Sequence, residues 1–454
     1  MTLDLLKSRR IHVVGVGGSG MGPIAIVLAA MGHRVSGSDA VASPVLDRLS
    51  DRGVEVFVGH GADRLDTDVD VVAVSTAIPA DNAEVMEARR RGLPVLRRAD
   101  VLAGIAGTRR TIAVAGTHGK TTTSTLLALV LKAGGERPSW IIGGELLGAA
   151  AGAHWDEGAW LVLEADESDG TFIELGAEAV IVTNVEADHL EHYGGWDGLV
   201  SAFDSFVEQT SGPRVVCLDD TGAAALADRF TVTTYGTDKR AGYRIENPRF
   251  SRFEASFTLR AGAESVTVAL PAPGLHNVRN ATAALALGHR LGVPLEVGAA
   301  GVANYGGIAR RFQRRGERAG ITFVDDYAHL PSEVKAAVAA ARGGNWDRVV
   351  AVFQPHRYSR TQQVGADFGG SFDGVDFLVL TDVYAAGEQQ RDAVSGDIVR
   401  RAVMSMPDHP DLIYVEERAD LASAVAGVLR SGDLCLTLGA GDVTKVADEI
   451  QAIL

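Results

Sequence analysis

The chain has 454 residues, of which 46% are hydrophobic and 22% are charged. This composition excludes a disordered or fibrous protein, and at about 150 residues per domain the length predicts roughly three domains. Lysine and arginine number 43 against 58 aspartate and glutamate residues, so the formal net charge is −15. A surface with this charge repels nucleic acid and anionic membranes. We therefore expect small-molecule substrates, no nucleic-acid partner, and only local phosphate sites.

Two cysteines, Cys217 and Cys435, lie in apolar segments typical of buried strands. The absence of a CxxC pair and of a disulfide framework favours a reducing compartment. The apolar run over residues 11–31 contains five glycines and Pro23, which is typical of a strand, a turn and a helix rather than of a signal peptide. No stretch reaches the ~18 continuous apolar residues of a membrane span. We expect a cytoplasmic protein without membrane insertion.

Short β-branched runs alternate with helical runs from residue 11 to about 107, which predicts a parallel sheet with crossover helices. The first strand leads into Gly15-Val-Gly-Gly-Ser-Gly20, which fits G-x-G-x-x-G and precedes a helical run. Asp39 ends the following strand, where this motif places a ribose-binding acid. The pattern alone predicts NAD. The same turn suits any diphosphate, and a purely structural glycine turn is the alternative.

A second unit begins at Thr111 with an apolar strand, a glycine turn and a long helical run. The turn, Gly116-Thr-His-Gly-Lys120-Thr121-Thr122, is typical of a phosphate-binding loop. Its glycines let backbone N–H groups surround phosphates, Lys120 neutralises β and γ oxygens, and Thr121 can ligate Mg²⁺. Two residues separate the glycines, whereas the standard loop has four. We expect ATP to bind here.

Two polar clusters follow the next strands of this unit. Glu164-Ala-Asp-Glu-Ser-Asp169 carries four carboxylates, which beside a triphosphate are expected to hold Mg²⁺. The spacing does not say which one does, and a solvated acidic turn is the alternative. Asn184-Val-Glu-Ala-Asp-His189 comes next, with His192 nearby. A lone histidine is more often a satisfied polar residue, but its place at a strand end favours a metal or phosphate contact for His189.

Alternation with a period of two from about 241 to 270 predicts antiparallel strands appended to the second unit, and helical segments follow to about Asn304. A third unit begins near Phe312 and again alternates strands with helices. We predict an α/β protein with domains at residues 1–107, 108–311 and 312–454. The first and third domains are expected to be Rossmann-like, and the second a P-loop ATPase domain with a mostly parallel sheet and a small antiparallel part.

The third unit has polar loops after two strands, Asp325-Asp-Tyr-Ala-His329 and Gln354-Pro-His-Arg-Tyr-Ser-Arg360. Arg357 and Arg360 are three residues apart, so on one helical face they could clamp a carboxylate or phosphate. Solvated surface arginines are the alternative. At the junction, Arg310-Arg311-Phe312-Gln313 could reach a γ-phosphate on domain closure or simply carry linker charges. Two nucleotide-type loops and an anion clamp favour an enzyme that joins substrates.

Seven motifs, in chain order, resemble those of the Mur ligases, the ATP-dependent ligases of peptidoglycan synthesis. They are GTHGKTTT, EADESDGTF, NVEADHLEHYG, GLHNVRNATAA, RRFQ, DDYAH and FQPHRYSRT, and they span nearly the whole chain. The shortened GTHGKT loop is the family's own form. Within the family, FQPHRYSRT is most similar to the members that add L-alanine to UDP-N-acetylmuramate.

The resemblance implies three domains that bind the UDP-sugar, ATP and the incoming amino acid. It also implies that the muramate carboxylate takes the γ-phosphoryl group of ATP, and that the amine of L-alanine then attacks the acyl phosphate. ADP and phosphate are the expected by-products. The implied co-substrate is ATP, the implied metal is Mg²⁺, and the implied substrates are UDP-N-acetylmuramate and L-alanine.

The family motifs assign roles to residues of this sequence. The implied catalytic residues are Lys120, Glu164, His189 and Arg311, and the implied metal ligands are Thr121, Glu164 and His189. The implied ATP contacts are Gly116, Thr117, His118, Gly119, Lys120, Thr121, Thr122, His276 and Asn280. The implied UDP-sugar contacts are Gly15, Gly17, Gly18, Ser19, Gly20, Asp39, Ser75 and Thr76. The implied amino-acid end consists of Tyr327, His329, Arg357 and Arg360.

Three other functions stay open at this point. A recycling ligase that adds an intact peptide to UDP-N-acetylmuramate would share the motifs of the first two domains, although FQPHRYSRT favours the alanine-adding enzymes. A nicotinamide-dependent dehydrogenase would use Gly15 to Gly20 but leaves GTHGKTT and EADESD unexplained. A non-enzymatic nucleotide switch would explain those two loops but not the third domain.

Overall fold

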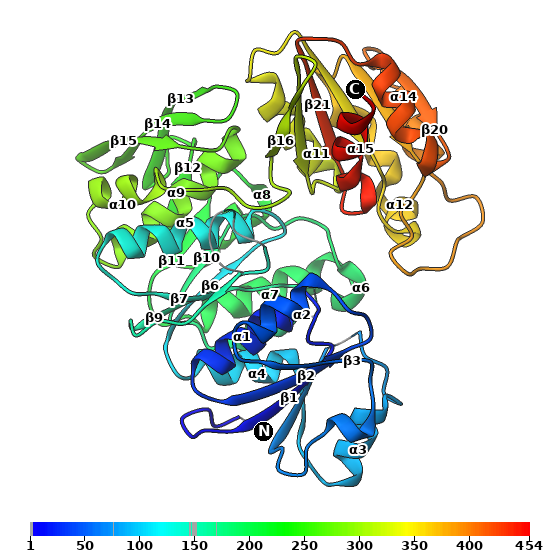
Figure 1. Ribbon diagram of the computed structural model, residues 1–454. Helices are drawn as coiled ribbons and strands as arrows, with labels where there is room; N and C mark the ends of the chain where they lie inside the picture. The colour runs from blue at the N-terminus through cyan, green and yellow to red at the C-terminus, as the bar shows by residue number, and fades with distance from the viewer. Residues whose placement is uncertain (1–2, 76, 145–146, 148–151, 169) are drawn as a thin grey trace. The chain divides into compact units, whose positions relative to one another are not determined.

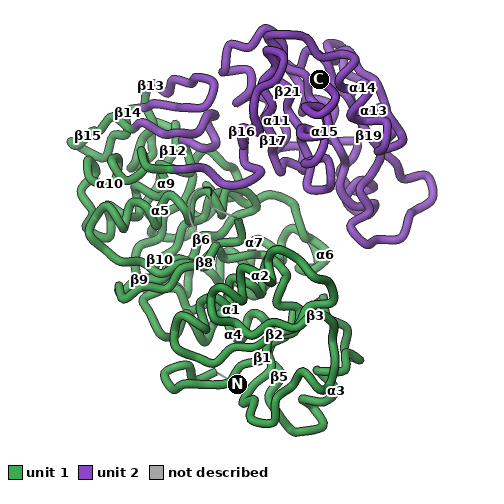
Figure 2. The backbone as a smooth tube through the Cα atoms, in the orientation of Figure 1, with its two compact units in different colours: residues 1–246, 258–268, 279–305 green, residues 247–257, 269–278, 306–454 purple. Residues whose placement is uncertain are grey.

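The computed structural model describes residues 3–75, 77–144, 147, 152–168 and 170–454. The chain divides into two compact units (Figure 2). The units comprise residues 1–246, 258–268 and 279–305, and residues 247–257, 269–278 and 306–454. Within the described residues, the strands form three sheets, of five, ten and six strands.

The first sheet is parallel throughout, in the order β3-β2-β1-β4-β5. Its strands β1, β2 and β3 are labelled in Figure 1. Val13 and Val14 of its central strand are fully buried, as expected for a strand covered on both faces. Pro23 lies in the first helical turn, where its missing N–H costs nothing. The elements are β1 (Arg10–Val14), α1 (Gly22–Ala30), β2 (Arg34–Asp39), α2 (Pro44–Ser50), β3 (Glu55–Val58), the 3-10 helix η1 (Ala62–Arg64), β4 (Val71–Val74), α3 (Ala83–Arg90), β5 (Val95–Arg97) and α4 (Arg98–Ala106).

The second sheet has the order β15-β14-β13-β12-β11-β10-β6-β9-β7-β8. Its strand β6 runs parallel to both neighbours, β10 and β9, so the loops after these three strands leave the sheet at one edge. Strands β7 and β8 are antiparallel. The elements are β6 (Arg110–Ala115), α5 (Lys120–Ala133), β7 (Ser139–Ile141), β8 (Ala153–His154), β9 (Trp160–Glu164), η2 (Thr171–Leu175), β10 (Ala179–Val182), α6 (Leu190–Tyr193), α7 (Trp196–Glu208), β11 (Arg214–Cys217), α8 (Thr221–Arg229), β12 (Thr233–Gly236), β13 (Tyr243–Phe250), β14 (Ala255–Ala261), β15 (Glu264–Leu270), α9 (Leu275–Arg290) and α10 (Leu295–Val302).

The third sheet has the order β16-β17-β21-β18-β19-β20, parallel except for β16. Phe323 and Val324, neighbours in β17, belong to different buried apolar clusters, so a core lies on each face of the sheet. The elements are β16 (Gln313–Arg318), β17 (Ile321–Asp326), α11 (Pro331–Arg342), β18 (Arg348–Phe353), α12 (Tyr358–Val364), η3 (Gly365–Phe372), β19 (Phe377–Thr381), α13 (Asp397–Met404), β20 (Asp411–Val415), η4 (Arg418–Asp420), α14 (Leu421–Val428), β21 (Asp433–Leu438), η5 (Asp442–Lys445) and α15 (Val446–Ile453).

These three mostly parallel sheets confirm the predicted α/β class. Cys217 and Cys435 are buried in β11 and β21, as predicted. Over the part of the chain that the structure describes, no helix has both the length and the apolar character needed to cross a bilayer. The exact domain boundaries stay predictions.

Candidate functional site

The loop between β6 and α5 has the backbone that a phosphate-binding loop requires. Gly116 and Gly119 adopt φ angles of 131° and 80°, which favour glycine. A Cβ on Gly116 would lie 2.2 Å from Oγ1 of Thr183, and a Cβ on Gly119 would lie 2.5 Å from Oδ1 of Asn280. Both positions therefore need glycine. Helix α5 begins at Lys120, directly after the loop, and its N-terminal dipole favours an anion there.

Lys120 is held in its charged form beside this loop. Its Nζ donates to the carbonyl oxygen of Gly116 at 2.8 Å and to the two carboxylate oxygens of Glu167 at 2.8 and 3.0 Å. Burial opposes the charge, but the carboxylates of Glu167, Asp166 and Glu164 outweigh burial and raise the pKa of Lys120. A charged ammonium at this position is suited to neutralise β and γ phosphate oxygens.

Thr121 and Glu164 bring two oxygen donors together. Oγ1 of Thr121, in the first turn of α5, donates to Oε1 of Glu164 at 3.1 Å, and Oε2 of Glu164 accepts from the N–H of Gly143 at 2.7 Å. Mg²⁺ prefers such hard oxygen donors and usually takes one or two carboxylates, with phosphate oxygens and water completing its shell. The pair therefore fits Mg²⁺ beside a nucleotide. Among the described residues, no cluster of three acidic, histidine or cysteine side chains could hold a metal.

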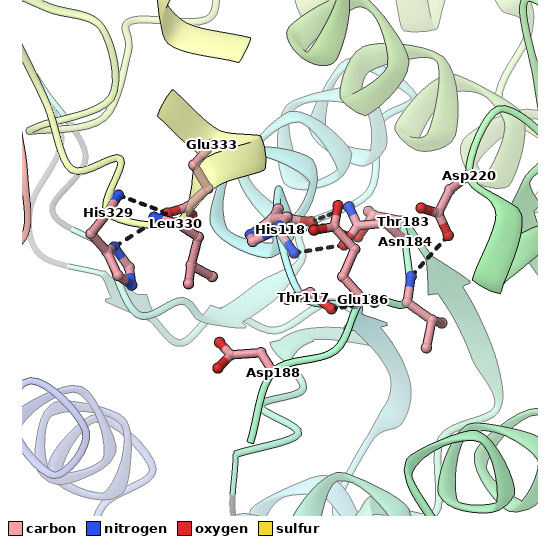
Figure 3. A network of polar contacts seen from close by, with 12 residues as sticks. Thr117, His118, Thr183, Asn184, Glu186, Asp188, Asp220, His329, Leu330 and Glu333 are labelled. Atoms are coloured by element: carbon pink, nitrogen blue, oxygen red, sulfur yellow. Dashed lines mark hydrogen bonds and ion pairs between the residues drawn. The ribbon is translucent and has the colours of Figure 1, made fainter. Parts of the chain in front are cut away.

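His118 ties the phosphate loop to the segment after β10 (Figure 3). Its N–H donates to Oδ1 of Asn184 at 2.7 Å, and its carbonyl oxygen accepts from Thr183 Oγ1 at 2.6 Å and Asn184 Nδ2 at 3.0 Å. Its Nε2 lies 3.2 Å from Oε2 of Glu186, whose N–H donates to Oγ1 of Thr117 at 2.9 Å. These bonds fix the backbone of the loop before any ligand binds.

Asp220 braces the same segment from the next strand along the sheet (Figure 3). One carboxylate oxygen accepts both from the N–H of Ala223, which caps α8, at 2.7 Å and from the N–H of Val185 at 3.0 Å. Burial raises the pKa of this carboxyl. Asp220 was not among the predicted site residues, although its position shortly after β11 is the signal that identified the other loops.

His189 lies at the start of the short helix α6, with a φ angle of 54°. Its Nε2 is 3.4 Å from Oδ2 of Asp188, and the imidazole is partly exposed. Because β10 ends at Val182, His189 follows a loop rather than the strand itself. A carboxylate beside an imidazole can orient the ring toward a metal. The metal role of His189 stays a prediction.

Helix α9 supplies the other predicted nucleotide contacts. His276 lies in its first turn and Asn280 four residues later, a spacing that places both on one helical face. Asn280 reaches the phosphate loop through its contact with the Gly119 position. Thr122 is buried in the first turn of α5, where it contributes to packing. Its contact with the nucleotide stays a prediction.

The predicted G-x-G-x-x-G turn joins β1 to α1. Gly15 has a φ angle of 80°, and a Cβ there would lie 3.2 Å from Cβ of Ser75, the residue after β4. The N–H of Gly17 donates to Oδ2 of Asp39 at 2.9 Å. Asp39 is the acid that would bind the ribose of NAD, but this hydrogen bond uses one of its carboxylate oxygens to hold the turn. The NAD interpretation is therefore weakened. Thr76 lies outside the described residues.

Arg98, the first residue of α4, lies beside this turn. Gly18 and Ser19 are exposed, and a Cβ on Gly20 would lie 3.1 Å from Nε of Arg98. That Nε is buried and has no hydrogen-bond partner among the described residues. A guanidinium beside a glycine turn at a helix start suits a diphosphate. The sequence alone does not predict Arg98 as a site residue, because only the fold brings the start of α4 beside this turn.

Glu333 contacts two of the predicted residues in the second unit, His329 and Arg311. Its Oε2 accepts from the N–H of His329 at 3.0 Å and lies 3.2 Å from Nδ1 of that residue (Figure 3). Arg311 places Nη1 3.8 Å from Oε1 of Glu333 and its guanidinium over the ring of Tyr327 at 5.2 Å. Glu333 was not predicted, although a glutamate in the first turn of a helix is a capping signal.

His356 connects this group to Arg360. Nη1 of Arg360 lies 3.2 Å from Nδ1 of His356, and because arginine always donates, His356 accepts and is neutral. Burial, followed by the charges of His329 and Arg360, lowers the pKa of His356 to about 4. Its ring also packs between those of His329 and Tyr384, at centroid distances of 5.9 and 5.8 Å.

Arg357 does not share a helical face with Arg360, so that part of the prediction is wrong. Helix α12 begins at Tyr358, and Arg357 precedes it with a φ angle of 69°. Its N–H donates to the carbonyl oxygen of Tyr384 at 2.8 Å, which holds the residue outside the helix. Both arginines still lie in the same short segment after β18.

The predicted junction segment is fastened to the third sheet. Arg310 and Phe312 have φ angles of 60° and 47°, and the N–H of Phe312 donates to Oδ2 of Asp326 at 2.7 Å. Nε of Arg310 lies 3.4 Å from Oδ2 of Asp325. Burial raises the pKa of Asp326 to about 6, against the lowering effect of Arg311 and two backbone N–H groups.

Three family profiles match consecutive segments of the chain. They describe the "Mur ligase family, catalytic domain" over residues 10–110, the "Mur ligase middle domain" over 114–288 and the "Mur ligase, glutamate ligase domain" over 310–441. Together with the similarity to full-length relatives, these matches show that the chain belongs to the Mur ligase family.

Two similar relatives are UDP-N-acetylmuramate–L-alanine ligases. The protein from Agrobacterium fabrum is 43% identical over 98% of this chain and 96% of its own length, and that from Myxococcus xanthus is 43% identical over 99% and 97%. A solved UDP-N-acetylmuramate-alanine ligase, MurC from Thermotoga maritima, superposes with a TM-score of 0.82 at 29% identity, covering 98% of this chain and 99% of that one. A murein peptide ligase from Psychrobacter arcticus shares the fold, with a TM-score of 0.70, 23% identity and 98% coverage of both chains.

Proposed function

We propose that this chain joins L-alanine to the lactyl carboxylate of UDP-N-acetylmuramate and converts ATP to ADP and phosphate, as a step of peptidoglycan precursor synthesis. The observation that carries the proposal is the phosphate loop with its charged Lys120. It occurs in a chain that matches alanine-adding ligases over nearly its full length.

The chemistry explains why the reaction needs ATP. A carboxylate is a poor electrophile because its leaving group would be an oxide. Transfer of the γ-phosphoryl group to a carboxylate oxygen forms an acyl phosphate and ADP. The amine of L-alanine then attacks the acyl carbon to form a tetrahedral intermediate, which expels phosphate as the C–N bond becomes an amide and the nitrogen loses a proton.

The residues around α5 support phosphoryl transfer. Lys120 would exchange Glu167 for β and γ oxygens, and the N–H groups of Gly116 to Gly119 would surround the phosphates. Thr121 and Glu164 would hold Mg²⁺, which when bound neutralises charge on the phosphoryl oxygens. His189 is proposed as a further ligand on the family resemblance. The tight hydrogen bonding of His118 supports a loop that needs no reorganisation to bind ATP.

The first sheet is proposed to bind the UDP-sugar. The turn from Gly15 to Gly20 offers N–H groups and a helix start to the diphosphate, and Arg98 adds a guanidinium with an unused Nε–H. Ser75 would lie at the same edge because it follows the neighbouring strand β4. Asp39, which braces the turn, would act by shaping the site.

The third sheet is proposed to bind L-alanine. Arg357 and Arg360 would hold its carboxylate, with Tyr327 and His329 beside them, and Arg311 would reach toward phosphate. We accordingly propose domains at residues 1–107 for the UDP-sugar, 108–311 for ATP and 312–454 for the amino acid. The two buried thiols support a cytoplasmic location, where peptidoglycan precursors are made.

Product analysis tests this proposal. Purified protein is incubated with ATP, Mg²⁺, UDP-N-acetylmuramate and one acceptor, which is L-alanine, glycine, L-serine or the tripeptide of the recycling reaction. We expect mass spectrometry to detect UDP-N-acetylmuramoyl-L-alanine as the preferred product. A clear preference for the tripeptide would contradict the acceptor assignment.

A further inference from the structure

The loop after β19, residues 382–396, is fastened to the segment that carries the two arginines. The N–H of Tyr384 donates to the carbonyl oxygen of Pro355 at 2.9 Å, and its carbonyl oxygen accepts from Arg357 at 2.8 Å. Farther along the loop, Nη1 of Arg391 donates to Oε1 of Gln362 at 2.8 Å. Loop and segment therefore form one hydrogen-bonded structure.

Glu388 lies in the middle of this loop and contacts the first turn of α12. Its Oε2 accepts from the N–H of Ser359 at 2.9 Å, and its Oε1 accepts from Oγ of the same serine at 2.5 Å. An N–H in the first turn has no partner within its own helix, so the carboxylate satisfies it. Ser359 lies between Arg357 and Arg360, so this contact fixes the backbone from which both guanidiniums extend.

The backbone of the loop is shaped to present Glu388. The N–H of Glu388 donates to the carbonyl oxygen of Ala385 at 3.0 Å, which closes a turn. Ala386 and Gly387 within this turn have φ angles of 49° and 84°. A left-handed alanine is strained, and such strain persists only where surrounding contacts demand it. The hydrogen bonds to Ser359 are contacts of that kind.

We propose that Glu388 is a positioning residue for the acceptor amino acid, because it holds the first turn of α12 so that Arg357 and Arg360 are placed for the acceptor's carboxylate. Ser359 donates hydrogen bonds to both carboxylate oxygens of Glu388, and the charge of Glu388 would repel the carboxylate of the acceptor. Glu388 therefore acts through α12. This inference rests on the proposed function, which assigns the arginines to L-alanine.

Steady-state kinetics of phosphate release test the proposal. KM values for L-alanine, ATP and UDP-N-acetylmuramate are measured for wild type, Glu388→Ala, Glu388→Asp, Glu388→Gln and Arg360→Lys. Asp392→Ala is the matched control, because Asp392 is an exposed acid in the same loop. Melting temperatures are recorded for every variant.

We expect Glu388→Ala to raise the KM for L-alanine by about tenfold or more, because small displacements of binding groups are costly, with the other two KM values within about twofold. Glu388→Asp keeps the charge but falls one methylene short of Ser359, so it should raise the same constant. Glu388→Gln can accept from the N–H and donate to the hydroxyl of Ser359, so it should stay within about threefold of wild type. Asp392→Ala should match wild type.

An alanine KM within twofold of wild type in both Glu388→Ala and Glu388→Asp overturns the positioning role. So does a rise of all three KM values that follows a fall in melting temperature. Arg360→Lys separates the two proposals, because it keeps the charge but loses the fork. If that variant leaves the alanine KM unchanged, the assignment of the arginines fails, whatever Glu388 does.

Discussion

Among single residues, Lys120 offers the most direct test of the proposed ATP site. We expect Lys120→Ala to lower ligation by about 10³-fold or more, because an ammonium aimed at the β and γ oxygens stabilises charge that develops as the phosphoryl group moves. The measurement is turnover with saturating UDP-N-acetylmuramate and L-alanine. Lys132→Ala is the matched control, since Lys132 is an exposed lysine in the last turn of the same helix.

The loss of Lys120 also leaves Glu167 buried without its counter-ion, which can cost about 3–5 kcal/mol of stability. The double variant Lys120→Ala/Glu167→Gln removes both charges. It should recover the melting temperature but not the turnover. Near-normal turnover in either variant would contradict the ATP loop.

Asp326 predicts a pH dependence of stability. Its pKa is about 6 in the folded protein against an ordinary value of 3.8, so between these pH values the folded state keeps a proton that the unfolded state has lost. Its contribution to the free energy of unfolding is therefore complete below about pH 4 and is lost as pH rises through about 6. The loss amounts to about 3 kcal/mol.

The measurement is the free energy of unfolding from urea titrations at several pH values, for wild type and Asp326→Asn. The difference between the two proteins isolates Asp326, because the lowered pKa of His356 acts with the opposite sign in the same range. We expect wild type to lose stability relative to Asp326→Asn between pH 4 and 6.5. If the free energies of unfolding of the two proteins change in parallel with pH, burial does not raise the pKa of this carboxyl.

At the scale of elements, the two ends of α5 offer a matched pair of glycines. Gly119 and Gly135 both have left-handed backbone, but a Cβ on Gly119 would lie 2.5 Å from Asn280, whereas Gly135 has open space around it. Replacement by alanine should cost each about 1–2 kcal/mol through the backbone. Only Gly119→Ala should also raise the KM for ATP, by about tenfold or more, because it distorts the phosphate loop. Equal ATP constants in both variants would contradict this role.

The strand-end loops could be predicted because their signals are local. The glycines and Lys120 stand directly between a β-branched strand and a helical run, and the structure has β6 and α5 there. The Gly15 to Gly20 turn was found in the same way. For the carboxylate cluster, the sequence located the loop but not the partners, because only the fold pairs Glu164 with Thr121 and Glu167 with Lys120.

Two of the missed residues, Arg98 and Glu388, act across long sequence separations. Arg98 lies beside Gly20 although four strands of the first sheet separate them along the chain, and Glu388 reaches Ser359 from the loop of a neighbouring strand. No spacing rule connects such pairs. Arg357 was misplaced for a similar reason, because a hydrogen bond to Tyr384 overrides the helical spacing.

At the scale of the whole molecule, the proposed function assigns one substrate of the reaction to each of the three sheets. Each sheet carries glycine-rich or charged loops after parallel strands, and none of them alone has the groups for all three substrates. A ligase built in this way should hydrolyse ATP slowly unless both other substrates are bound, because the carboxylate is the phosphoryl acceptor and the amine completes the reaction.

Phosphate release therefore tests directly whether the chain is a ligase that needs both substrates. It is measured with ATP and Mg²⁺ alone, with UDP-N-acetylmuramate, with L-alanine, and with both substrates. We expect sustained release only in the last mixture, with one phosphate formed for each UDP-N-acetylmuramoyl-L-alanine. Sustained release that is equally fast without the UDP-sugar or without the amino acid would contradict this expectation.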